Sequence, residues 1–213
     1  MTDSTASTEI LLKNAISGDN DSLSQLFDKY RGRLRRMVQI RMDRRLQGRV
    51  DPSDVLQEAF LDMSKRLPEY AREESYPFFL WLRMLTGQRL MHVHRFHLQT
   101  AMRDAGREVS LYRKAMPEAN SMSLAANLLG RMTSVSEKAM RAEVQVKLQE
   151  TLNGLDDIDR EILVLRHFEE LSNKEAAKVL GIRKSAASNR YMRALKRLKD
   201  ILSSVPGMLD EKT

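Results

Sequence analysis

The stretch that decides the fold runs from Ser172 to Lys199 and reads SNKEAAKVLGIRKSAASNRYMRALKRLK. Its first part predicts a short helix, because Ser172 and Glu175 match a capping box, in which each side chain accepts a hydrogen bond from the other residue's backbone amide. Gly181 follows, and a glycine there lets the chain reverse within a few residues before a second, longer helix. Small alanine side chains on both segments allow the helices to cross closely. The pattern therefore predicts a helix-turn-helix.

The second of these helices carries charge of one sign. From Arg183 to Lys199 the sequence has seven lysines and arginines and no acidic residue. Cationic side chains suit DNA phosphates, and the hydroxyl and amide groups among them suit base edges. The residues that we expect to contact duplex DNA are Lys184, Ser185, Ser188, Asn189, Arg190 and Arg193. The alternative is a solvated basic helix that closes a bundle.

The remaining sequence also favours helices. Among 213 residues there are only 9 glycines and 5 prolines, and apolar residues recur at spacings of three and four between Leu23 and Val38, which predicts a helix there. Asp51 and Pro52 predict the start of the next helix, which Pro68 should end. A third helix is predicted over 78–98. These segments predict a helical domain over residues 1–105.

The helical signal weakens after this domain and then returns. Residues 106–133 contain Pro117, scattered serines and one short apolar patch, which is typical of a linker. Further on, Gly154 breaks one predicted helix and Asp156 opens the next. We therefore predict an all-α fold of two small helical domains, 1–105 and 134–213, joined by a linker over 106–133.

The composition limits the class of protein. The 36 lysines and arginines exceed the 29 acidic residues by seven, and the pI is near 9.7, which favours a polyanionic partner, with nucleic acid ahead of an anionic membrane. The absence of cysteine excludes a disulfide framework, a thiolate metal site and a cysteine nucleophile. No signal peptide and no run of 18 apolar residues is evident, so we expect a soluble, cytoplasmic protein without membrane insertion.

Charge in the N-terminal domain alternates in sign along the chain. Residues 31–49 hold eight arginines and one acid, and residues 51–62 hold four acids and no base. Asp54, Gln57 and Glu58 on the acidic helix would suit a basic protein partner. An ordinary solvated helix face explains the acidic segment equally well on this evidence alone.

Aromatic residues are concentrated beside the basic part of this domain. Five of the twelve aromatic residues lie between Tyr70 and Trp81, and aromatic rings next to cations are what unstacked single-stranded bases need. Pro77 disfavours helix for the residue before it, so Tyr76 is predicted to lie on a loop, free to meet a base. Trp81, inside the following helix, is predicted to belong to the core, and for each ring of the cluster taken singly a place in the core is an equally good explanation.

These motifs together resemble the bacterial sigma-70 family of RNA polymerase sigma factors, in its extracytoplasmic-function (ECF) group. The sequence DPSDVLQEAF at 51–60 resembles region 2.2, and FLWLR at 79–83 resembles the neighbourhood of regions 2.3 and 2.4. The segment from 165 to 198 resembles region 4.2. Only counterparts of regions 2 and 4 are present, which is the layout of the ECF group.

The resemblance implies a sigma factor that binds core RNA polymerase, through its β′ and β subunits, and directs initiation at promoter DNA. The residues implied in core binding are Asp54, Gln57, Glu58 and Phe60. Those implied in opening and reading the −10 element are Tyr76, Phe78, Arg83, Arg89 and Arg95. The six residues of the basic helix named above are implied in recognition of the −35 element. An anti-sigma partner is compatible with this reading, and no cofactor is implied. Arg183 and Gly87 depart from the family's usual residues, so promoter sequence does not carry over.

Other functions find less support. No phosphate-binding loop, nucleophile elbow or H-E-x-x-H motif is present, so we predict no enzyme. His92, His94 and His97 are the candidate metal ligands, but only the last two share a helix face, and we predict no metal site. The main alternative is a stand-alone, two-domain helix-turn-helix regulator that binds duplex DNA. A third is an RNA-binding or antitermination protein.

Overall fold

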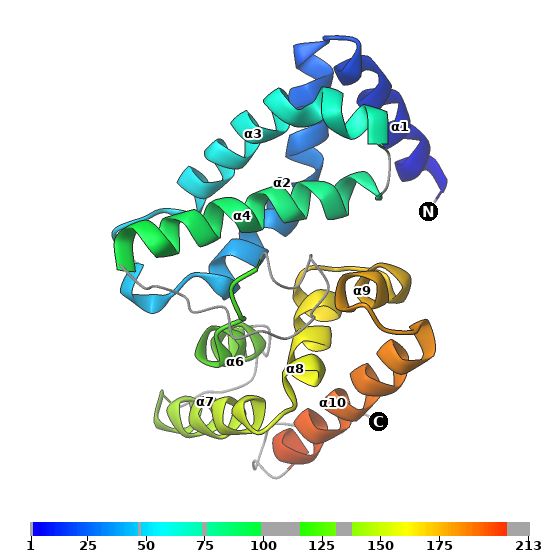
Figure 1. Cartoon of the computed structure of the whole chain (residues 1–213). Coiled ribbons are helices and arrows are strands. Elements are labelled where there is room, and N and C mark those ends of the chain that lie inside the picture. Colours follow the sequence, from blue (N-terminus) through cyan, green and yellow to red (C-terminus); the bar gives the residue numbers. More distant parts are fainter. Residues whose placement is uncertain (1, 47, 74–75, 99–115, 131–137, 204–213) are drawn as a thin grey trace. The chain divides into compact units, whose positions relative to one another are not determined.

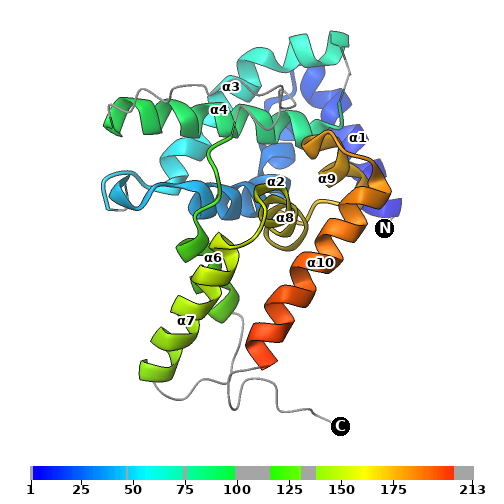
Figure 2. The same cartoon turned by 60° about the horizontal axis from the view of Figure 1, so that its bottom comes forward.

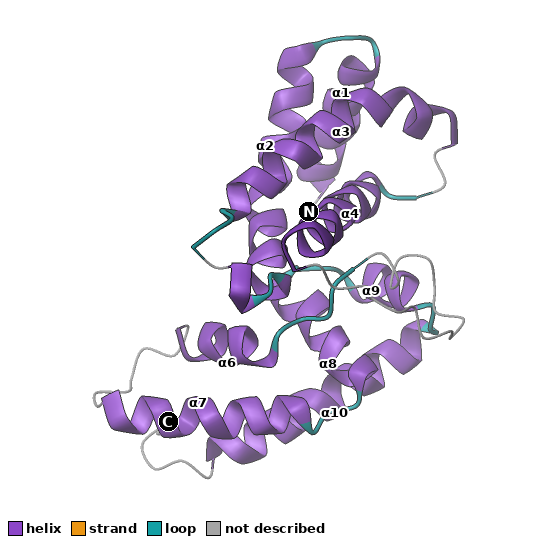
Figure 3. Ribbon diagram, turned by 60° about the vertical axis from the view of Figure 1, so that its left-hand side comes forward, coloured by secondary structure: helices purple, strands orange, loops and turns teal. Residues whose placement is uncertain are grey.

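The computed structural model describes residues 2–46, 48–73, 76–98, 116–130 and 138–203 (Figure 1). Over these residues all regular structure is helical and there is no strand (Figure 3). The chain divides into two compact units. The predicted all-α fold is confirmed.

The first unit is built from α1 (Thr2–Ile16), most of α2 (Asn20–Arg41), a 3₁₀ turn η1 (Arg44–Leu46), α3 (Pro52–Glu73) and α4 (Phe78–Leu98). Helices α3 and α4 lie side by side, and α1 also contacts α3. The side chains that fill its core include Leu26, Leu34, Met37, Val38, Leu56, Met63, Leu82, Leu85 and Leu90. They come from the predicted apolar stripes, whereas α1 was not predicted.

Helix α3 begins where the sequence indicates and ends later. The Asp51 carboxylate accepts a hydrogen bond from the Ser53 amide at 2.7 Å, and the Asp54 carboxylate accepts one from the Asp51 amide at 3.2 Å. The predicted end at Pro68 is wrong, because the helix continues to Glu73. Proline removes one backbone donor, but burial of Tyr70 in the core fixes the last turn. The prediction for α4 is confirmed.

The second unit is built from α6 (Ser121–Gly130), α7 (Lys138–Asn153), α8 (Asp157–Leu163), a π-helical turn η2 (Val164–Phe168), α9 (Asn173–Leu180) and α10 (Lys184–Ser203). Helix α6 packs along α7, and α10 contacts α7, α8 and α9 (Figure 2). Its core includes Leu124, Ala125, Leu129, Val144, Leu148, Leu152, Leu163, Val164, Phe168, Ala194 and Leu198.

Helix α6 lies inside the segment predicted to be a linker. Leu124, Ala125 and Leu129 are almost completely buried against other helices of the second unit. The Asn120 side chain accepts hydrogen bonds from the first amides of the helix. The short apolar patch therefore forms a helix because it can bury one face. Both predicted domain boundaries, 105/106 and 133/134, fall outside the described residues, so they remain predictions.

The helix-turn-helix is confirmed by its local geometry. The Ser172 hydroxyl accepts from the Glu175 amide at 3.2 Å, and the Glu175 carboxylate accepts from the Ser172 amide at 2.7 Å, which completes the capping box. Gly181 ends α9 with a φ of +66°, a left-handed conformation that glycine adopts without strain. The chain then enters α10 three residues later.

Candidate nucleic-acid interface

The N-terminal end of α10 presents most of the predicted DNA contacts. Lys184, Ser185, Ser188 and Asn189 are all exposed there. The Asn173 side-chain amide, at the start of α9, donates to the Lys184 carbonyl at 2.8 Å and to the Ser188 hydroxyl at 2.9 Å. The two helices are thus fixed to each other where the predicted base-reading groups are exposed to solvent.

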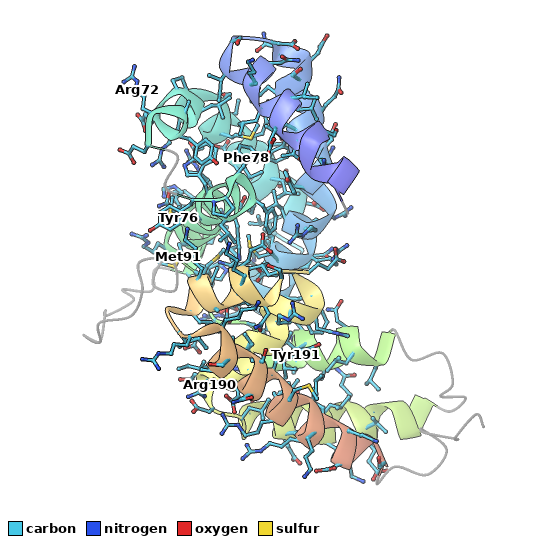
Figure 4. The ribbon with its side chains drawn as sticks, turned by 90° about the vertical axis from the view of Figure 1, so that its right-hand side faces the viewer. Arg72, Tyr76, Phe78, Met91, Arg190 and Tyr191 are labelled. Carbon is cyan, nitrogen blue, oxygen red and sulfur yellow. The ribbon has the colours of Figure 1, made fainter. Side chains whose placement is uncertain are left out.

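Arg190 and Arg193, the other two predicted contacts, are engaged by acidic residues at the start of α8. Arg190 donates to the carboxylates of Asp159 at 2.6 Å and Asp156 at 3.3 Å, and the Nε of Arg193 lies 3.1 Å from Asp159. The hydrogen bond to Asp159 raises the pKa of Arg190, and the one from Arg190 lowers the pKa of Asp156. Arg190 and its neighbour Tyr191 are labelled on α10 in Figure 4.

The predicted core-binding residues fall on two sides of α3. Gln57 and Phe60 line a hollow of about 500 Å³ between α2 and α3, where the Phe60 ring meets Phe27 edge to face at 5.2 Å. Asp54 and Glu58 line a second hollow, of about 440 Å³, toward α4. Asp54, Gln57 and Glu58 are exposed, whereas Phe60 is half-buried. A partner that contacts all four residues must therefore cover α3 from both sides.

Arg89 was predicted to contact DNA, but its guanidinium faces α3. It donates to both carboxylate oxygens of Asp62 and lies 3.7 Å from a carboxylate oxygen of Glu58. Hydrogen bonding to Arg89 lowers the pKa of Asp62. The sequence could not show this pairing, because the acid and the base lie on different helices.

Phe78 and Arg83, which the resemblance implies in the −10 interaction, are both buried, with 6% and 1% of their surface exposed. The Phe78 ring packs against the rings of Tyr30, Tyr70 and Trp81 at centroid distances of 6.0, 5.6 and 5.7 Å. Trp81 is buried too, which confirms its predicted place in the core. The first turns of α4 are buried on every side, so these positions cannot meet DNA in this conformation.

Three other side chains at the ends of α4 are accessible. Tyr76 lies between α3 and α4 outside any helix, as predicted (Figure 4). Its side chain is half-buried, and its carbonyl accepts a hydrogen bond from the Tyr70 hydroxyl at 2.9 Å. Arg95 is exposed near the other end of α4, next to Phe96, which is 74% exposed. The sequence prediction missed Phe96, although an aromatic residue between Arg95 and His97 was a usable signal.

The histidines of α4 differ in their burial. No group of three His, Cys, Asp or Glu side chains in the described part of the chain could hold a metal ion. His94 is buried, its Nε2 accepts a hydrogen bond from the Asp43 amide at 3.3 Å, and burial lowers its pKa. His92 and His97 are exposed. Of the helices that the structure describes, none has the length and apolarity needed to cross a bilayer.

Comparisons with known proteins agree with this geometry. Residues 145–198, from α7 to α10, match the family model described as Sigma-70, region 4. The chain is 27% identical over 192 residues to the ECF RNA polymerase sigma factor SigD of Mycobacterium tuberculosis, covering 90% of this chain and 82% of that one. It is 26% identical over 154 residues to the RNA polymerase sigma factor NccH of Alcaligenes xylosoxydans xylosoxydans, covering 72% and 74%. The structure of CnrH in complex with the cytosolic domain of CnrY matches with a TM-score of 0.54 at 22% identity, covering 93% and 98%.

Proposed function

This chain belongs to the ECF group of the sigma-70 family of RNA polymerase sigma factors, and from that premise we propose that it binds core RNA polymerase and directs promoter-specific initiation. In this proposal it is a non-catalytic protein of the cytoplasm. The observation that carries the proposal is the helix-turn-helix, whose cap, turn and exposed polar end of α10 form a surface that fits the major groove.

We assign −35 recognition to the second unit. Base edges would be read by Ser185, Ser188 and Asn189, with Lys184 and Arg193 placed for phosphates. Arg190 is left out of this set because its guanidinium is held by Asp156 and Asp159. The first unit would dock on the polymerase β′ subunit through Asp54, Gln57, Glu58 and Phe60.

We assign opening of the −10 element to the ends of α4. Tyr76 and Arg95 are separated by nineteen residues, which along a helix corresponds to about 28 Å, so they would contact different nucleotides. Phe96 takes the place of the buried Phe78 as an accessible ring for base stacking. Phe78, Arg83 and Arg89 would then support this face from inside the unit.

A protein partner is also part of the proposal. The solved relative CnrH was determined in complex with the cytosolic domain of CnrY, and we extend to this chain the expectation that an anti-sigma protein can bind it. No cofactor is required for any of these interactions.

Transcription in vitro tests the proposal most directly. Purified core RNA polymerase and the full chain would be incubated with a genomic promoter library, and transcripts that require both proteins are expected. A stand-alone regulator would bind duplex DNA without core polymerase and start no transcripts. An RNA-binding protein would instead bind structured RNA tightly in the absence of core polymerase.

A further inference from the structure

A single buried carboxylate joins α8 to the DNA-facing helix. The side chain of Asp159 is 4% exposed, and its two oxygens pair with two different arginines of α10, one through a hydrogen bond and the other through a salt bridge. One oxygen lies 2.6 Å from Nη1 of Arg190, and the other lies 3.1 Å from Nε of Arg193. Because the two arginines are three residues apart, they lie on the same face of the helix.

The two arginines are held in different ways. Arg190 uses Nη1 for both Asp159 and Asp156, and only 26% of its side chain is exposed. Arg193 meets Asp159 through Nε, and its side chain is 55% exposed. A guanidinium is planar and carries five N–H donors, so an arginine anchored through Nε still offers its two Nη groups as a fixed pair for a phosphate or a guanine.

Burial makes this division persistent. A buried carboxylate is costly unless it is paired and hydrogen-bonded, so Asp159 keeps its contact with Arg190, and Asp156 adds a second negative charge beside the same nitrogen. A DNA phosphate that approaches Arg190 would therefore be repelled by two carboxylates, whereas Arg193 is held by Asp159 through Nε. In this arrangement Arg193 can contact a DNA phosphate, whereas Arg190 is kept from doing so.

We propose that Asp159 is a positioning residue for −35 binding, which withdraws Arg190 from DNA and fixes Arg193 with its Nη edge toward a phosphate. This inference rests on the proposed function of the second unit. Its consequence is selectivity, because a released Arg190 would contact any phosphate and strengthen binding to every sequence alike.

The test uses the full chain and two DNA probes: a short duplex of mixed sequence, and a duplex that the wild-type chain selects from a randomised pool. Affinity for each is measured across a salt titration. Asp159→Asn should bind the mixed duplex several-fold more tightly. Its salt slope, the slope of log K against log[salt], should be steeper by about 0.9, the value of one extra phosphate contact. The ratio of selected to mixed affinity should fall. Asp156→Asn is the matched control, because Asp156 is 62% exposed and contacts Arg190 but not Arg193 through hydrogen bonds, and its slope should stay unchanged.

Two further variants keep the inference testable even if Asp159→Asn fails to fold. Arg193→Gln should lower the salt slope by about 0.9 on both probes, whereas Arg190→Gln should leave it unchanged. Equal losses from both arginine variants would overturn the inference, as would an unchanged slope and ratio in a folded Asp159→Asn chain. If the wild-type chain selects no sequence at all, the proposed −35 function fails, while the comparison of slopes on the mixed duplex still decides the role of Asp159.

Discussion

Tyr76 is a single side chain whose accessibility is set by its neighbour in sequence. Pro77 disfavours helix at position 76, and the Tyr70 hydroxyl holds the Tyr76 carbonyl, leaving the ring half-buried between α3 and α4. The backbone carbonyl at position 76 is therefore held by a contact that does not involve the Tyr76 ring. A substitution of the ring should change what this position contacts without removing that hydrogen bond.

In the holoenzyme, Tyr76→Ala should spare closed-complex binding but reduce permanganate-detected opening at the −10 element, since stacking on an aromatic ring contributes about 1–3 kcal/mol per base. Trp81→Ala is the contrasting change, because the Trp81 ring is buried at 4.7 Å from that of Tyr70. It should lower the stability of the free chain by about 3–5 kcal/mol, measured by urea unfolding. Wild-type opening rates with Tyr76→Ala would remove that residue from the melting mechanism.

His94 predicts a pH dependence of stability. Burial lowers its pKa from the ordinary value of 6.5, partly offset by Asp43, and the neutral Nε2 accepts the Asp43 amide hydrogen bond. The unfolded chain therefore binds a proton near pH 6.5 that the folded chain does not, so the free energy of unfolding should fall as the pH drops below that value. Urea midpoints at about pH 7.5 and about pH 5.5 would measure the change.

His94→Gln is the control for this effect, because glutamine can accept the same amide hydrogen bond and does not titrate in this range. The variant should lose less stability on acidification than the wild type. An equal loss in both chains would assign the pH dependence to other groups.

At the scale of single residues, sequence reasoning succeeded where a neighbour decides the outcome and failed where another helix does. The loop position of Tyr76 followed from Pro77, and the core position of Trp81 followed from its place inside a helix. Phe78 and Arg83 were assigned to the −10 element by the resemblance, and their burial follows from packing between helices that the sequence does not show. The pairing of Arg89 could not be predicted because the acids that bind it lie on α3.

Helix α3 carries the prediction that belongs to the scale of elements. If Glu58 docks on a basic polymerase surface, Glu58→Lys should weaken binding to core polymerase by electrostatic repulsion, while helicity and melting of the free chain stay unchanged. Glu58 lies 3.7 Å from Arg89, but the main partner of Arg89 is Asp62. The substitution of Glu58 therefore leaves the Arg89–Asp62 pair in place. Binding would be measured by fluorescence titration of labelled chain with core polymerase.

Glu69→Lys provides the matched control on the same helix. Glu69 is 69% exposed and lies 3.6 Å from Arg66, three turns beyond Glu58. The same charge reversal at that position should leave core affinity unchanged. Equal affinities of the Glu58 and Glu69 variants would argue against docking through Glu58.

The elements that could be predicted are those with local signals. The starts of α3 and α9 follow from capping side chains, and α2 and α4 follow from apolar spacing. Helix α6 and the end of α3 could not be predicted, because burial against other helices outweighs weak propensity in α6 and a proline in α3. The helix-turn-helix was the best-predicted part of the candidate site, since its cap, turn and charge all lie within one short segment.

At the scale of the whole molecule, we propose that promoter recognition is divided between the two units. The residues of α10 that we propose to read bases belong to the second unit, and Tyr76 belongs to the first. Contacts to bases act only where the right base is present, whereas the net charge of +7 favours DNA of any sequence. When one promoter element is replaced, substitutions in the unit that reads it should therefore cause no further defect. Substitutions in the other unit should keep their effect.

Asn189 and Tyr76 allow this division to be tested in the holoenzyme. On a promoter taken from the transcription library, Asn189→Ala should reduce closed-complex affinity by about 1–3 kcal/mol, the value of a good base contact. After replacement of the −35 sequence it should cause no further loss, because the base that Asn189 reads is gone. Tyr76→Ala should still slow opening on that promoter, and its defect should disappear on DNA whose −10 element is already unpaired by mismatches. Effects at independent sites must add. The proposed division is therefore wrong if the Asn189→Ala loss of affinity persists after the −35 sequence is replaced. It is also wrong if replacing the −35 sequence removes the opening defect of Tyr76→Ala.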